Sequence, residues 1–186
     1  MQIRLSFLKN HKPLWIVLLV TFFSHSFVAL IPPLQGDEAY FWEWSRHLSF
    51  GYYSHPPMTG GLIALITAIF DVSKYTVRLT SILLHLVTLF YVYLLALETI
   101  NSKKIANVSV LLLALMPLSL VFGTAITTDS SLIAFYTVSV YYTRKAIILN
   151  DKKFWYLAAI FCGGMLLSTF MALLFFPGVF LFLTVN

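Results

Sequence analysis

The sequence has 186 residues, of which 60% are hydrophobic and only 10% are charged. A soluble domain carries about 25% charged residues, so this composition excludes an ordinary soluble fold and indicates a membrane protein. The net charge of +5 does not indicate nucleic-acid binding, because the basic residues form short clusters between apolar segments, as membrane topology produces.

The apolar segments are long enough to predict membrane-spanning helices, which need about 20 residues each. The first run, residues 14–31, is long for a signal peptide, and no small-x-small cleavage site precedes Pro32. We therefore interpret it as an uncleaved first span. The sequence predicts one all-α, polytopic membrane domain over residues 1–186 with about five spans, near residues 14–31, 79–97, 105–128, 130–149 and 154–176.

Residues 32–78 form a predicted loop that carries juxtamembrane helices. The apolar piece at 60–70 would be about 16 Å long as a helix, too short for a hydrocarbon core of about 30 Å. It is interpreted as a juxtamembrane or re-entrant helix. A second short helix over 37–48 would place Tyr40, Phe41 and Trp44 on one face, resting on the bilayer.

The distribution of basic residues predicts the orientation of the spans. The sequence has three basic clusters. One precedes the first span, one lies between the second and third spans, and one lies between the fourth and fifth. The positive-inside rule assigns all three, and with them the N-terminus, to the cytoplasm. Asp37 and Asp129 then share the other, non-cytoplasmic face. The chain ends inside or just after an apolar run, and we expect it to be the N-terminal part of a longer protein.

These two aspartates are the candidate catalytic residues. Asp37 follows the stiff Pro32-Pro33 pair at the exit of the first span, where it would lie at the mouth of any cavity between the helices. Asp129, in TTDSSL, has a simpler interpretation as a helix-capping residue at the positive end of a span. A carboxylate at membrane depth is nevertheless costly and is usually functional.

Three motifs carry a resemblance to a known group of enzymes. Asp37-Glu38 with AYFWEWS, then GYYSHPPM, then YTVRLTSILLH resemble, in order and spacing, the bacterial branch of the protein O-mannosyltransferase and aminoarabinose transferase families. These are polytopic GT-C glycosyltransferases that take sugars from polyprenyl-phosphate carriers. The resemblance covers about residues 36–183. It implies that Asp37 is the catalytic base and that Asp129 helps to shape the site.

Two positions depart from the family pattern. The family often has Asp-His-Pro-Pro where this chain has Ser54 before His55, and a lysine where this chain has Thr169. The roles that those acidic and basic side chains play in the family therefore do not carry over to this chain.

The reaction that the resemblance implies needs a base and groups that stabilise a departing phosphate. The candidate substrate- and phosphate-binding residues are Glu38, Arg46, His55 and Arg78. Arg78 has an alternative role as an interfacial residue whose charged end reaches water. His55 has an alternative, structural role as part of a rigid bend before two prolines. No cofactor is demanded, but Asp37 and Asp129 could hold a Mg²⁺ or Mn²⁺ ion, which prefer oxygen ligands.

The sequence thus predicts a glycosyltransferase in the bacterial inner membrane, with its active-site face in the periplasm. Its expected partners are a polyprenyl-phosphate sugar donor, membrane lipids and a lipid A, protein or glycan acceptor, and not nucleic acid. The alternatives are a multi-spanning transporter or flippase, in which charges near the span centres and inverted repeats would be more typical, and a non-catalytic membrane subunit.

Overall fold

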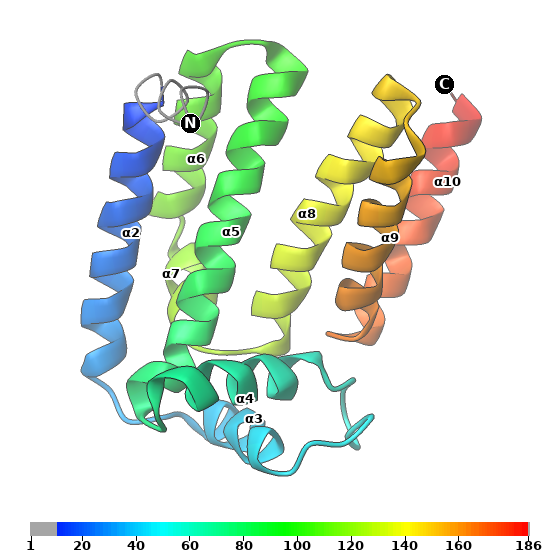
Figure 1. The fold of residues 1–186 in the computed structure, drawn as a ribbon. Helices are drawn as coiled ribbons and strands as arrows, with labels where there is room; N and C mark the ends of the chain where they lie inside the picture. Colours follow the sequence, from blue (N-terminus) through cyan, green and yellow to red (C-terminus); the bar gives the residue numbers. More distant parts are fainter. Residues whose placement is uncertain (1–10, 186) are drawn as a thin grey trace.

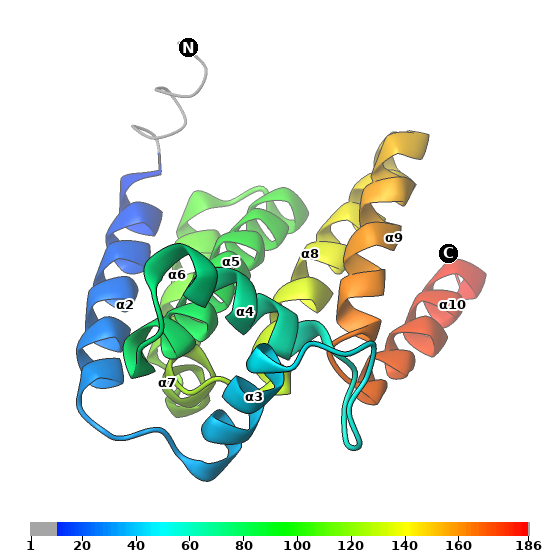
Figure 2. The same cartoon turned by 60° about the horizontal axis from the view of Figure 1, so that its bottom comes forward.

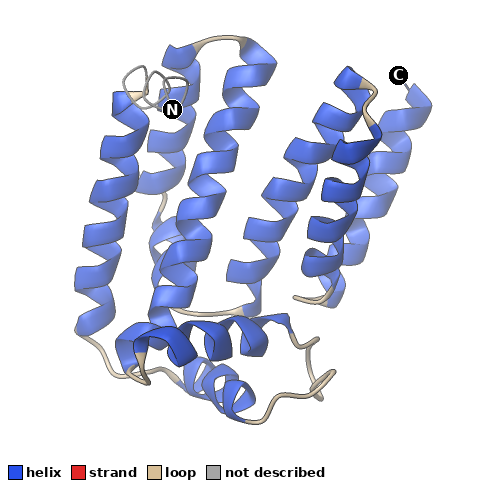
Figure 3. Ribbon diagram, viewed as in Figure 1, coloured by secondary structure: helices blue, strands red, loops and turns tan. Residues whose placement is uncertain are grey.

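The computed structural model describes residues 11–185, and this part of the chain consists of helices joined by loops, with no strand (Figure 3). This confirms the predicted all-α class. The elements are α2 (Lys12–Leu30), α3 (Gly36–Arg46), α4 (Met58–Phe70), α5 (Lys74–Ile100), α6 (Lys103–Leu115), α7 (Pro117–Thr124), α8 (Thr128–Leu149), α9 (Lys152–Leu166), the 3-10 helix η1 (Phe170–Leu174) and α10 (Phe175–Val185).

The two longest helices have clear start and stop signals. α5 begins after Ser73 and α8 after Thr127, whose hydroxyl groups accept hydrogen bonds from backbone N–H groups of the first turn. Such side chains satisfy donors that have no partner inside the helix. Both helices end at an asparagine in the left-handed conformation, Asn101 and Asn150, a residue type that tolerates this backbone at a helix end.

The long helices run roughly side by side, and α3 and α4 lie across one end of them (Figure 1; Figure 2). α5 is the central element, since it packs against α2, α6 and α7 on one side and α8 on the other. α9 packs along α8, and α10 returns beside them towards the opposite end (Figure 1). A core of Leu14, Leu89, Tyr93, Ala106 and Val110 joins α2, α5 and α6.

Two to three of the roughly five expected spans are long and apolar enough to cross a membrane. α2 and α5 each meet these limits, and α6 with α7, which are bent by 71° relative to each other, give a third if the pair is counted as one span. The bend lies at Met116 and Pro117, where proline cannot donate the next helical hydrogen bond. α8 has 22 residues but many hydroxyl-bearing ones, and α9 has only 15.

The last expected span, residues 154–176, is divided in the structure. α9 ends at Leu166, and Thr169 adopts an extended backbone, so that η1 and α10 turn back along the bundle. The backbone N–H of Met58 donates a hydrogen bond of 2.9 Å to the carbonyl oxygen of Leu167. This contact ties the turn to the beginning of α4. The break in the last expected span is therefore stabilised by a contact with a distant part of the chain.

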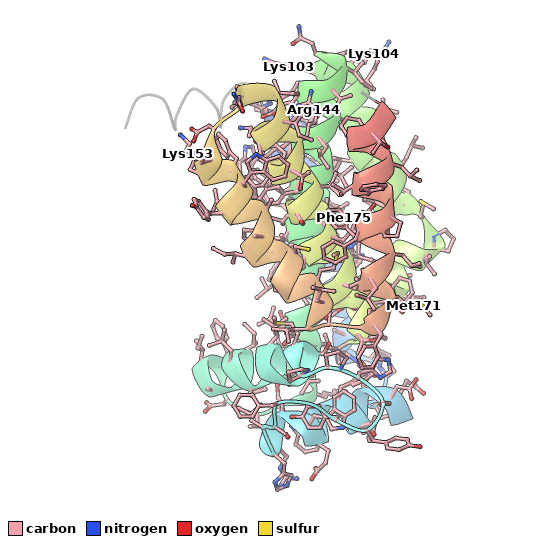
Figure 4. The ribbon with its side chains drawn as sticks, turned by 90° about the vertical axis from the view of Figure 1, so that its right-hand side faces the viewer. Lys103, Lys104, Arg144, Lys153, Met171 and Phe175 are labelled. Carbon is pink, nitrogen blue, oxygen red and sulfur yellow. The ribbon has the colours of Figure 1, made fainter. Side chains whose placement is uncertain are left out.

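The two ends of the bundle differ in charge. The end opposite α3 and α4 carries basic side chains at the ends of the helices, and Figure 4 shows Lys103, Lys104, Arg144 and Lys153 there. The end with α3 and α4 carries five of the seven acidic residues: Asp37, Glu38, Glu43, Asp71 and Asp129. The grouping of Asp37 with Asp129 at one end therefore follows from the fold.

Candidate functional site

Asp37 and Asp129 occupy equivalent positions in two different helices. Each lies in the first turn, two residues after the N-cap, of α3 and α8 respectively. Asp37 is exposed and Asp129 is half-buried. A carboxylate at such a position is stabilised by the positive end of the helix dipole.

The side chain of Glu38 brings the beginnings of these two helices together. Its carboxylate accepts a hydrogen bond from the backbone N–H of Gln35 (2.9 Å), which completes a capping box at the start of α3. It also accepts one from the backbone N–H of Ile126, in the segment that leads into α8. Asp37 adjoins Glu38, and Asp129 is three residues after Ile126. Each aspartate therefore lies close in sequence to one partner of the contact between Glu38 and Ile126.

Arg78 completes this arrangement from the first turns of α5. Its Nε atom lies 2.8 Å from Oε1 of Glu38 and its Nη2 atom lies 2.6 Å from Oε2. The remaining N–H groups donate to the carbonyl oxygens of Ala29, Pro32 and Pro33, at 2.8–2.9 Å. Arginine has five N–H donors, so each of them has a partner within the protein.

This ion pair is buried, since Glu38 is 1% and Arg78 is 2% exposed. Burial by itself raises the pKa of Glu38, but the hydrogen bonds from Arg78 and from the Gln35 backbone, with the charge of Arg78, hold that pKa below its ordinary value. Glu38 is therefore ionised at neutral pH. The pair joins four segments next to Asp37: the end of α2, the loop after it, α3 and α5.

The structure does not bring Arg46 to the aspartates. Arg46 is nine residues after Asp37 in α3, which is about 14 Å along the axis and on the opposite side of the helix. It is exposed, forms an ion pair of 3.2 Å with Glu43, and lies over the ring of Trp42. These contacts are those of a solvated helix end, so we do not retain Arg46 as a phosphate ligand.

His55 lies at the same end of the bundle and packs against aromatic side chains of α3. Its ring contacts Phe41 edge-on and Trp44 at a tilt, with centroid distances of 6.3 and 6.2 Å. Its Nδ1 atom is buried and has no hydrogen-bond partner. The contacts of His55 in this structure are therefore packing contacts, and its buried Nδ1 atom is not accessible to a substrate group.

Thr169, the residue at the position of the family lysine, is also brought to this end. Thr169 is 6% exposed and adjoins Ser168, which is fully buried. Beside this turn, the Oγ1 atom of Thr59 in α4 and the Oγ atom of Ser131 in α8 are 2.9 Å apart. Three segments thus meet near Ser131, two residues after Asp129: the turn after α9, the start of α4 and the start of α8.

The described residues offer an incomplete set of metal ligands. Within residues 11–185 no three His, Cys, Asp or Glu side chains are close enough to hold one ion. Asp37 and Asp129 would supply two carboxylates, whereas Ca²⁺ and Mg²⁺ take six or more oxygen ligands, some of them water. We assign no step to a metal.

Comparison with known proteins identifies the family. The family model for dolichyl-phosphate-mannose-protein mannosyltransferases matches residues 54–186, which is more than half of the chain. The chain belongs to this family. The matched segment of the chain includes His55, Arg78, Asp129 and Thr169, and it begins after Asp37 and Glu38.

A relative from Rhizobium johnstonii matches a shorter stretch. Over 74 residues the chain is 35% identical to the lipid A galacturonosyltransferase RgtD, and this stretch covers 39% of the chain and 14% of that protein. No solved structure matches the chain. The match supports the glycosyltransferase assignment of the family.

Sequence reasoning named Glu38 and Arg78 but missed that they bind each other. The local signal was weak, because Glu38 fits the N3 position of a capping box but Gln35 is not the Ser or Thr that usually stands at its N-cap. The partner of that glutamate lies 40 residues later in the chain, and no local pattern shows that distance. The contact of Glu38 with the backbone of Ile126 was missed for the same reason.

Proposed function

We propose that this protein is a membrane glycosyltransferase that transfers a sugar from a polyprenyl-phosphate-linked donor to a nucleophilic acceptor group. Membership of the mannosyltransferase family supports the reaction class. The observation that carries the site is the junction of the α3 and α8 N-termini around the buried Glu38–Arg78 pair, which holds the two aspartates at one end of the bundle.

Asp37 is the proposed general base. Its carboxylate is exposed at the end of the bundle and can accept a proton from an acceptor hydroxyl or amine. The acceptor oxygen or nitrogen then forms a bond to the anomeric carbon of the sugar. The bond between that carbon and the phosphate oxygen breaks, and its electron pair leaves with the polyprenyl phosphate.

Asp129 is the proposed second carboxylate, and its role is to orient the substrate beside Asp37. Glu38 and Arg78 are positioning residues, because the donors of Arg78 are all engaged within the protein. Of the residues predicted to bind phosphate, His55 remains at this end, where it packs against Phe41 and Trp44.

The proposed location is the bacterial inner membrane, with the N-terminus in the cytoplasm and the site at the periplasmic face. The support is the charge of the two ends of the bundle. Among the described residues, the end away from the site carries Lys12, Lys103, Lys104, Arg144, Lys145, Lys152 and Lys153, and basic residues near span ends face the cytoplasm.

The experiment that tests this function is a transfer assay on the full-length protein. The protein is reconstituted in vesicles with a radiolabelled polyprenyl-phosphate sugar, and transfer to lipid A is measured first, because a matched relative is named for that acceptor. Peptide and glycan acceptors are separate arms. Loss of the proton acceptor in Asp37→Asn is expected to lower turnover at least 10²-fold.

The matched control is Glu43→Gln, which removes an exposed carboxylate from the same helix on the side of Arg46. This variant should keep its turnover. Equal turnover of Asp37→Asn and the wild-type protein would contradict the assignment of the base. Absence of transfer from any polyprenyl-phosphate sugar to any of the acceptors would contradict the proposed reaction.

A further inference from the structure

A large apolar groove runs along the bundle on the side away from α2. Its walls are α8, the last turns of α5, the 3-10 helix η1 and α10, and its volume is about 1040 Å³. Figure 4 views the molecule from this side, with Phe175 between α8 and α10. This volume lies just above the range of about 300–1,000 Å³ for small-molecule sites.

The groove changes character along its length. At the end nearer the proposed active site, its lining consists of apolar side chains such as Leu132, Met171 and Leu174. At the opposite end the lining includes Thr143 and Arg144. Between Leu132 and Arg144, α8 advances by about 18 Å, slightly more than half of a hydrocarbon core of about 30 Å. The part of the groove between Leu132 and Arg144 thus spans about one leaflet, and Ile147 and Ile148 continue the lining beyond Arg144.

Arg144 gives the polar end of the groove a positive charge. Two of its N–H groups donate to Glu98, one to Oε2 at 3.3 Å and one to the carbonyl oxygen at 2.8 Å. Three of its five donors remain. Lys145 lies 3.2 Å from the same carboxylate. Glu98 therefore neutralises one of two cations, and the cluster keeps a net positive charge beside Lys152 and Lys153.

An apolar groove with a cation at one end is complementary to a lipid with an anionic head group. We propose that the groove binds an anionic phospholipid, with an acyl chain between α8 and α10 and the phosphate at Arg144. Basic pockets between transmembrane helices bind acidic lipid head groups in this way. The polar end is opposite Asp37 and Asp129, so the phosphate of this lipid is distinct from that of the sugar donor.

A larger side chain at Gly178 in α10 would fill part of the groove without disturbing its walls. Gly178 lines the groove, and a Cβ atom added to it would have no atom within 4 Å. Gly163 in α9 is a matched control, since it is also open but does not line the groove. Leu at either position removes a helix glycine, so both changes favour the helix to a similar extent.

The test is lipid binding to the purified full-length protein in detergent, measured by native mass spectrometry. Phosphatidylglycerol and phosphatidylcholine with the same acyl chains are the two probes. Phosphatidylglycerol should bind at least fivefold more tightly, since one cation contributes about that factor near an anionic lipid. Arg144→Gln should reduce the difference, whereas Lys153→Gln, which does not line the groove, should keep most of it.

Gly178→Leu should lower the binding of phosphatidylglycerol at least tenfold, and Gly163→Leu should leave it unchanged. The proposal is wrong if the two lipids bind equally to the wild-type protein. It is also wrong if Gly178→Leu binds phosphatidylglycerol as the wild-type protein does, which would indicate that another helix of the full-length protein fills the groove. Both glycine variants retain Arg144 and Glu98, so neither result depends on breaking that ion pair.

Discussion

Glu38 in α3 and Arg78 in α5 form a buried ion pair in which Nη2 of Arg78 lies 2.6 Å from Oε2 of Glu38. The carbonyl oxygens of Ala29 in α2 and of Pro32 and Pro33 in the loop after it accept from the other donors of the guanidinium group. A backbone N–H before α8 donates to the same carboxylate. Four segments of the chain therefore meet at this pair, beside the residue that we propose as the base.

The first prediction concerns the stability of the fold. In Arg78→Met the buried carboxylate of Glu38 loses its charged partner, and removing one member of a buried pair costs about 3–5 kcal/mol. We expect that loss in the free energy of unfolding, measured by chemical denaturation in detergent. Arg46→Gln, which breaks an exposed pair, should change it by less than about 1 kcal/mol. Equal effects would show that the Glu38–Arg78 pair does not hold the fold together.

The second prediction concerns the pH dependence of stability. The pKa of Glu38 is lower in the folded protein than in the unfolded chain, where a glutamate has a pKa of about 4.3. The unfolded chain therefore takes up a proton first as the pH falls. The stabilisation by Glu38 is complete above about pH 4.3 and is lost as the pH falls through the folded pKa. Thermal unfolding of the wild-type protein between pH 3 and 7 should show this loss.

The comparison variant for the pH experiment is Glu38→Gln, which has no group to titrate at this position. Its stability should be lower at neutral pH, and the difference from the wild-type protein should shrink on acidification. A difference that stays constant from pH 7 to pH 3 would contradict the assignment, because it would mean that Glu38 is not ionised in the folded protein.

The third prediction uses a close approach between helices. Gly123 in α7 faces the stacked rings of His25 and His85, and a Cβ atom at this position would lie 2.5 Å from His25 and 2.8 Å from His85. Both histidines are buried. Gly123→Ala should destabilise the protein by about 1–3 kcal/mol, as overpacking of a core does. Thermal unfolding measures the effect.

The control for this variant is Gly163→Ala, because a Cβ atom at Gly163 meets nothing within 4 Å. It should be neutral or slightly stabilising, since alanine is the better helix former. If Gly123→Ala unfolds at the same temperature as Gly163→Ala, α7 does not approach the two histidines as closely as the structure shows.

The fourth prediction separates two roles of Asp129. As a capping residue in the first turn of α8 it contributes about 0.3–1 kcal/mol through the helix dipole. Asp129→Asn should therefore lower the free energy of unfolding only slightly. If Asp129 orients the substrate, the same variant should lower turnover at least tenfold in the transfer assay. Unchanged turnover would leave Asp129 with the capping role alone.

Much of the fold could be predicted from local patterns. The run at 14–31 became α2, the short pieces at 37–48 and 60–70 became α3 and α4, and Pro117 marks the bend between α6 and α7. These features depend on hydropathy, length and proline chemistry, which act within a few residues. The shared position of Asp37 and Asp129 was predictable because basic clusters report the direction of each span.

The divided last span could not be predicted in this way. Residues 154–176 contain no charge and no proline, and the pair Ser168-Thr169, where the turn lies, is a weak signal inside an otherwise apolar run. The turn is held by a hydrogen bond from Met58, more than 100 residues earlier. The Glu38–Arg78 pair escaped prediction for a similar reason, because each residue alone has the appearance of an exposed charge near the membrane surface.

The unequal charge of the two ends makes the protein an electric dipole along the membrane normal. A bacterial inner membrane is held negative on its cytoplasmic side, and each elementary charge moved across it changes the energy by about 2.3 kcal/mol per 100 mV. In the proposed orientation the lysine-rich end faces the negative side and the carboxylates face the positive side. An energised membrane therefore reinforces the orientation that exposes Asp37 to the periplasm, and a collapsed potential removes that contribution.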